Sequence, residues 1–156
     1  MSRTTDALAK DHDQHHRLLE RLAQAVDAQA SPAEVHARWH RFETNLFDHM
    51  DTEERVLFGV FSQSHRLELQ SLRAAHQTIR TAAIALHVSV ALHRVQRPAI
   101  EELQALLRAH AEQEDASLHL WIDRDEGILS HRGVLAMIAR RSRVAEEPTE
   151  IIPHAD

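Results

Sequence analysis

The sequence predicts an all-α protein: an antiparallel up-down four-helix bundle with a short C-terminal fifth helix. The 156-residue chain contains only 3 glycines and 4 prolines, so it carries few of the residues that end strands and form tight turns. Hydrophobic residues recur at alternating spacings of three and four along four long segments, which is the pattern of one buried helix face. Four amphipathic helices joined by short connections are typical of an antiparallel bundle.

Each predicted helix has recognisable ends. Ser31 and Pro32 supply an N-cap and a first helical residue, and Pro98 separates two later helices. Gly59 and the polar residues that follow it mark the break in the middle of the chain, and Gly127 marks the last one.

These boundaries divide the chain into two parts. We expect a four-helix bundle over residues 1–127 and a short helix with a polar tail over residues 128–156. The expected helices cover residues 4–29, 32–60, 65–95, 98–125 and about 131–143.

Composition narrows the class of protein. Hydrophobic residues make up 43% and charged residues 27%, as in ordinary folded domains, and the absence of cysteine excludes thiolate chemistry. No apolar run approaches the roughly 18 residues of a membrane span, and the N-terminus lacks a signal-peptide pattern, which predicts a cytoplasmic protein with no membrane partner. The net charge of −6, with a single basic run at 140–143, argues against nucleic acid as a partner. The oligomeric state is not predicted.

The predicted buried faces are apolar at both ends and polar in the middle. The same spacing places Val56 and Val60 on the buried face of the second segment and Ser117 on that of the fourth. Burying an ionised carboxylate or an imidazole without a partner costs several kcal/mol. A single buried histidine is usually satisfied by a neighbour, whereas six polar residues spread over four helix faces need one shared partner. These candidate metal ligands are His12, His49, Glu53, His76, His110 and Glu114.

The spacing of these residues favours a metal site. The motif His-x-x-x-Glu occurs twice, at residues 49–53 and 110–114, and residues four apart share one helix face about 6 Å apart. His12 and His76 come from the other two helices, so the chain repeats the order His, His-x-x-x-Glu. Imidazole and carboxylate without thiolate suit iron, manganese or zinc, and bundle cores accommodate two metals roughly 3.5–4 Å apart.

Four segments of the chain resemble one known family. They are DHDQHHRLLERL at 11–22, HMDTEERVLF at 49–58, AAHQTIR at 74–80 and HAEQED at 110–115. Over roughly residues 5–125 the chain resembles the hemerythrin-like proteins, the HHE cation-binding class. The resemblance implies two non-haem iron ions, oxo- or hydroxo-bridged, with both glutamates bridging the metals and oxygen, nitric oxide or peroxide as the small ligand.

The sequence departs from classical hemerythrin in its histidine count. That family has a fifth histidine one turn along its third helix, where this chain has Arg80. His15, on the buried face, and His16, four residues after His12, are alternatives for a fifth ligand. Otherwise one of them is a hydrogen-bond partner of a ligand and the other is partly exposed.

Other polar residues near the motifs have less specific explanations. Glu54 and Asp115 each follow a motif glutamate, and we expect them to face outward or to contact the ligands from outside. His36 and His40 are also four residues apart and could form a second metal clip, but they have no carboxylate beside them, which favours a solvated or end-of-bundle role.

Three functions remain open. The first is a di-iron protein that binds oxygen or nitric oxide as a carrier, sensor or scavenger. The second is a di-iron enzyme that acts on nitric oxide or peroxide or donates iron for iron–sulfur cluster repair. Four histidines, two bridging glutamates and an oxo bridge leave about two of twelve positions open, which favours bridging peroxide or two nitric oxides, and so chemistry over simple carriage. The third is a structural zinc-binding or pH-responsive interaction module. The sequence favours a binding protein over a turnover enzyme, because no separate general acid or base occurs on the buried faces.

Overall fold

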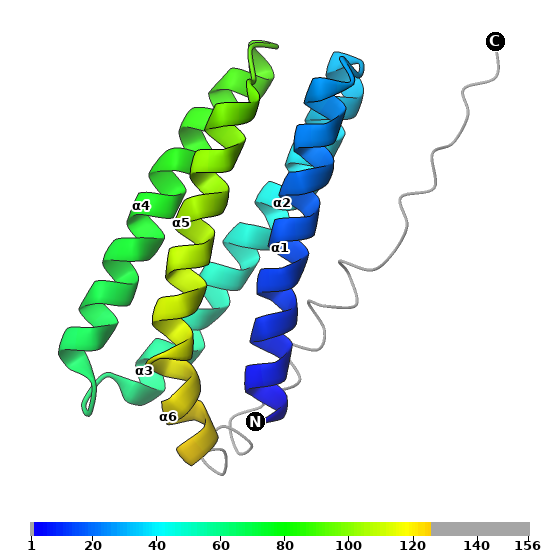
Figure 1. The fold of residues 1–156 in the computed structure, drawn as a ribbon. Helices are drawn as coiled ribbons and strands as arrows, with labels where there is room; N and C mark the ends of the chain where they lie inside the picture. Colours follow the sequence, from blue (N-terminus) through cyan, green and yellow to red (C-terminus); the bar gives the residue numbers. More distant parts are fainter. Residues whose placement is uncertain (1, 126–156) are drawn as a thin grey trace.

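The computed structural model of the protein describes residues 2–125, which form a bundle of long antiparallel helices (Figure 1). No strand occurs in this part of the chain. The elements are α1 (Arg3–Asp27), α2 (Pro32–Thr52), the π-helical turn η1 (Glu53–Leu57), α3 (Phe58–Phe61), α4 (Arg66–Ala91), α5 (Arg97–Asp115) and α6 (Leu118–Arg124). The helix predicted at 131–143 and the polar tail lie outside the described residues.

The long helices form a square in cross-section. α1 packs against α2 and α5, and α4 packs against the same two helices, so α1 and α4 lie on one diagonal. α2, η1 and α3 follow one another without a loop and make one rod of the bundle. The predicted all-α four-helix fold is confirmed. Among residues 2–125, no helix has both the length and the apolar character that crossing a membrane requires.

The two helical hairpins, α1–α2 and α4–α5, close with the same turn. Gln29 and His93 have φ values of 53° and 54°, in the left-handed region that ends many helices. In both turns the next amide bonds to the carbonyl five residues earlier, at 2.9 and 2.8 Å. These turns end α1 and α4 before the predicted residues 29 and 95. Gln29 follows His12 at the same distance in sequence as His93 follows His76, so the internal repeat includes the turns.

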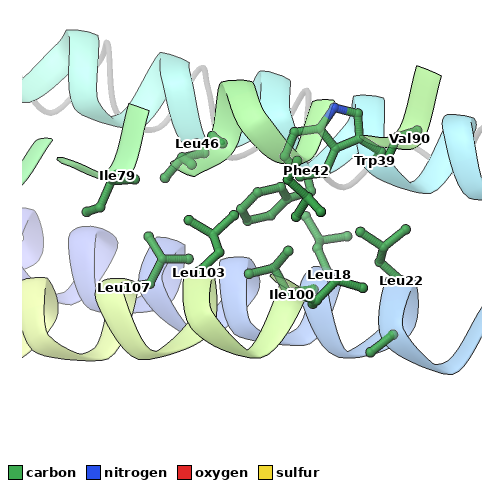
Figure 2. Close-up of a cluster of buried hydrophobic side chains, with 14 of the residues drawn as sticks. Leu18, Leu22, Trp39, Phe42, Leu46, Ile79, Val90, Ile100, Leu103 and Leu107 are labelled. Atoms are coloured by element: carbon green, nitrogen blue, oxygen red, sulfur yellow. The ribbon is translucent and has the colours of Figure 1, made fainter. Parts of the chain in front are cut away.

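The hydrophobic core consists of two clusters. The larger cluster fills the half of the bundle nearest the two hairpin turns, and Figure 2 shows its side chains interdigitating from facing helices. Its labelled members are Leu18, Leu22, Trp39, Phe42, Leu46, Ile79, Val90, Ile100, Leu103 and Leu107. The smaller cluster, at the α3 and α6 end, contains Leu8, Leu57, Phe58, Phe61, Leu69, Leu72, Leu118, Trp121 and Ile122. A buried polar layer separates the two clusters.

The π-helical turn changes which residues of the second rod face the core. The regular spacing predicted Val56 and Val60 on the buried face, but both are only partly buried. Leu57 and Phe61 are buried instead, at 0% and 3% exposure. A π turn inserts an extra residue into a helical turn, so every residue after it rotates relative to a regular helix. The predicted face is therefore wrong by one residue beyond Glu53.

The last helical segment of the bundle, formed by α5 and α6, is also irregular after Glu114. The sequence predicted one helix over residues 98–125, but α5 ends at Asp115 and a new helix begins at Leu118. Ser117, between them, has φ −138° and ψ −83°, which is not helical. Ser117 was expected on the buried face and is only partly buried, whereas Leu118 and Ile122 are fully buried.

Candidate metal centre

The structure brings all six predicted ligand residues together in the polar layer between the two hydrophobic clusters. They come from four different helical rods and are His12, His49, Glu53, His76, His110 and Glu114. Five of the six are at most 3% exposed, and His12 is the one with partial exposure, at 11% of its side chain. Among residues 2–125 the site is thus nearly closed to solvent, and its most exposed candidate ligand lies on α1.

One half of the centre is built around α1 and α2. Nε2 of His12 lies 3.0 Å from Nε2 of His49. Oε1 of Glu53 lies 3.3 Å from the same nitrogen of His49, and Oε2 of Glu114 lies 3.1 Å from Nε2 of His12. Two imidazole nitrogens and two carboxylate oxygens therefore converge from three helical rods.

The other half is built around α4 and α5 and has the same composition. Nε2 of His76 lies 3.3 Å from Nε2 of His110. Oε2 of Glu53 lies 3.3 Å from His76, and Oε1 of Glu114 lies 3.3 Å from His110. Each glutamate consequently directs one oxygen to each histidine pair.

The two buried glutamates lack hydrogen-bond donors. Neither oxygen of Glu53 or of Glu114 accepts a hydrogen bond from any residue in the range 2–125. Burial raises the pKa of both carboxyls to about 7, and the charge of Glu114 contributes to the shift at Glu53. Burying four carboxylate oxygens without hydrogen-bond donors is costly in free energy, and bound cations would compensate for that cost.

Two histidines of the centre are held in the neutral form that donates a lone pair. Burial and the neighbouring imidazoles lower the pKa of His110 to about 2, and burial lowers the pKa of His12. Burial alone would lower the pKa of His76 too, but contacts with Glu53 and Glu54 raise it. Neutral imidazole is the form that binds metal, so His12 and His110 are ready to bind one, whereas a protonated His76 would release a proton on binding.

Two of the four histidines have a carboxylate on the ring nitrogen that faces away from the centre. Nδ1 of His49 lies 3.3 Å from Oδ2 of Asp11, and Nδ1 of His76 lies 2.8 Å from Oε1 of Glu54. Nδ1 of His110 is buried and has no hydrogen-bond partner within residues 2–125. Such contacts fix which nitrogen faces a metal, and Glu54 is one of the outer contacts that the sequence offered as an alternative.

The structure places neither candidate fifth histidine among the converging ligand atoms. His15 is buried, and its ring centre lies 5.1 Å from that of His49 and 6.5 Å from that of His12. His16 is partly exposed and lines a surface pocket of about 240 Å³ between α1 and α5. Neither residue belongs to the two groups whose ligand atoms lie within 4.8 Å of one another.

Sequence reasoning missed one buried histidine beside the centre. His119, 4% exposed, lies with its ring parallel to that of His12 at 6.0 Å, and its Nδ1 is 2.7 Å from Oδ1 of Asp115. The spacing of four between Asp115 and His119 was visible in the sequence. Its inward position was not, because it depends on the helix break at residues 116–117.

A four-helix bundle that holds four histidines and two orphaned glutamates in a closed layer defines a metal-binding helical protein. Comparison with known families agrees, since residues 3–122 match the model of the hemerythrin HHE cation binding domain. The chain belongs to this family, which confirms the resemblance found in the sequence. No curated protein and no solved structure matches the chain.

Proposed function

We propose that the protein is a non-haem di-iron protein that binds a small diatomic ligand, oxygen or nitric oxide, as a carrier, sensor or scavenger. The proposed iron ligands are His12, His49, Glu53, His76, His110 and Glu114. The observation that carries the proposal is the orientation of the two glutamates, each of which directs one oxygen to each histidine pair. Carboxylates placed in this way suit two metals roughly 3.5–4 Å apart.

The choice of iron rests on the donor set and on the family. Imidazole and carboxylate ligands without thiolate are compatible with iron, manganese and zinc, and membership of the hemerythrin family favours iron. Bound iron would supply the redox chemistry that a diatomic ligand requires. The two hydrophobic clusters above and below the centre exclude water from it, and Asp11 and Glu54 hold two of the histidines with Nε2 facing inward.

Metal analysis of the purified protein, with visible spectra in air and after dithionite, tests the proposal. We expect about two irons per chain and near-ultraviolet bands of an oxo bridge that bleach on reduction. The double variant His36→Ala/His40→Ala is a matched control, because it removes two exposed histidines with the same spacing and should leave both metals in place. Less than about one metal per chain, or zinc alone after reconstitution with iron, would contradict the di-iron assignment.

A further inference from the structure

An ion pair on the outside of the centre contacts one candidate ligand directly. Oε1 of Glu54 lies 2.8 Å from Nδ1 of His76 and also accepts a hydrogen bond of 2.7 Å from Nη1 of Arg80. The second guanidinium nitrogen of Arg80 lies 3.3 Å from Oδ1 of Asp51. The Glu54–Arg80 pair therefore links the π-helical turn to α4 at the level of the polar layer.

The environment of this pair differs from that of an ordinary surface salt bridge. The side chains of Glu54 and Arg80 are each only 23% exposed, and His76 is fully buried beneath them. Charge-assisted hydrogen bonds in such partly buried positions are stronger and more directional than exposed pairs. A carboxylate that is held by a guanidinium remains an acceptor, so His76 donates its Nδ1 proton to Glu54 and keeps the lone pair of Nε2 for the centre.

His76 is also held on the face of its ring. The ring stacks on Phe58 with a centroid distance of 5.4 Å and an interplanar angle of 21°. By contrast, His49 has a longer contact of 3.3 Å to Asp11, and His110 has no partner for Nδ1 among residues 2–125. In the α4–α5 half of the centre, one histidine is thus firmly oriented and the other is not.

We propose that Glu54 and Arg80 are positioning residues that retain the metal bound by His76 and His110. The pair orients the ring of His76 and strengthens its Nε2 as a donor, which offsets the lack of a partner for Nδ1 of His110 within residues 2–125. This inference rests on the proposed function, because it takes His76 and His110 as ligands. It adds Glu54 and Arg80, which are not proposed ligands, to the residues that help to retain the metal.

Release of iron from the holoprotein to an excess of a ferrous chelator, followed by absorbance, tests the proposal. We expect Glu54→Gln to accelerate release of one of the two irons roughly tenfold, since the loss of such outer contacts typically weakens metal binding 10- to 100-fold. Arg80→Met should act in the same direction with a smaller effect, and Arg80→Lys should restore part of the retention.

The matched control is Arg55→Met. Arg55 lies in the same π-helical turn, but its side chain is 79% exposed and its ion pair, at 3.2 Å, is with Asp51. We expect its iron release to match that of the unaltered protein. Equal iron release rates in all variants and the unaltered protein would overturn the positioning role, and so would an effect of Arg55→Met as large as that of Glu54→Gln. It would also be overturned if the variants that release iron faster had lost apoprotein thermal stability to the same degree and Arg80→Lys restored no retention. Failure of the proposed function would look different, because the unaltered protein would then hold no iron before the chelator is added.

Discussion

The α1–α2 and α4–α5 hairpins present the same donors to the centre but support them differently. In the first hairpin, Asp11 directly precedes His12 and contacts Nδ1 of His49 at 3.3 Å. In the second, the residue that directly precedes His76 is Ala75, and Nδ1 of His110 is buried without a partner in the described chain. The two hairpins thus share the same metal-donor residues and the same turns, but they differ in the carboxylates that contact the histidines from outside. The two metals of the proposed centre would therefore have different surroundings.

The helix irregularities after the two motif glutamates add to this difference. The π-helical turn after Glu53 contains Glu54, which reaches His76 on α4. In the other half, Asp115 occupies the equivalent place but pairs with His119 across the break between α5 and α6. In one repeat the extra carboxylate, Glu54, therefore contacts a candidate ligand on a neighbouring helix, and in the other repeat Asp115 contacts a histidine outside the candidate ligand set.

Removing either carboxylate that we propose as a bridge should have the largest effect, because it would act on both halves at once. We expect Glu53→Gln and Glu114→Gln each to lose most of the bound metal, as measured by metal analysis after reconstitution. Glu112→Gln, two residues from Glu114 on the exposed side of α5, is the control and should retain both metals. Loss of metal from only one half in either variant would show that the glutamate does not bridge.

The same variants should make the metal-free protein more stable at pH 8. Burial raises the pKa of both carboxyls to about 7, well above the value in an unfolded chain, so their ionisation opposes folding above that pH. We expect each substitution to increase the free energy of unfolding of the apoprotein by roughly 1–2 kcal/mol at pH 8. The gain should shrink as the pH falls from about 7 and disappear below about 4.5, where both carboxyls are neutral in the unfolded chain as well as in the folded protein. A gain that is independent of pH would contradict this explanation.

The contact between Asp11 and His49 should matter less than either of the two proposed bridging carboxylates. Asp11→Asn keeps the shape of a side chain that is 7% exposed but removes its charge. We expect one of the two irons to reach a chelator roughly tenfold faster, by the same argument as for Glu54. Asp13→Asn, an exposed position on the same helix, is the control.

A double variant then sharpens the comparison of the two halves. If Asp11 and Glu54 act on different metals, Asp11→Asn combined with Glu54→Gln should accelerate both phases of release, each by its single-variant factor. An effect confined to one phase would mean that both carboxylates support the same metal.

The centre was predictable from the sequence because helical periodicity is a local property. Alternating steps of three and four put His12, His49, His76 and His110 on core faces, and the spacing of four added the glutamates. Irregular helix geometry is not local in this sense. The turn at Gln29 is one example, since a non-glycine residue in the left-handed region gives little sign in the sequence of where α1 ends.

The α3 and α6 end shows why the remaining errors occurred. There Phe61 and Trp121 pack at 5.8 Å, and His65 stacks flat on Trp121 at 3.9 Å and 2°. These contacts join residues far apart in the chain and coincide with the irregular geometry after both glutamates. A regular 3.6-residue period therefore placed Val56 and Val60 on the wrong side and missed His119.

The smallest expected effect comes from adding the contact that the second hairpin lacks. Ala75→Asp places a carboxylate directly before His76, where the first hairpin has Asp11 before His12. Ala75 is partly buried, so the new carboxylate should find Nδ1 of His110 as its nearest donor and slow iron release by a few-fold, at a cost of about 1 kcal/mol to apoprotein stability. Ala74→Asp, one residue earlier and exposed, should leave release unchanged. If Asp11→Asn accelerates release but Ala75→Asp does not slow it, then the α4–α5 half does not depend on His110 being oriented, and the Glu54–Arg80 pair alone secures that metal.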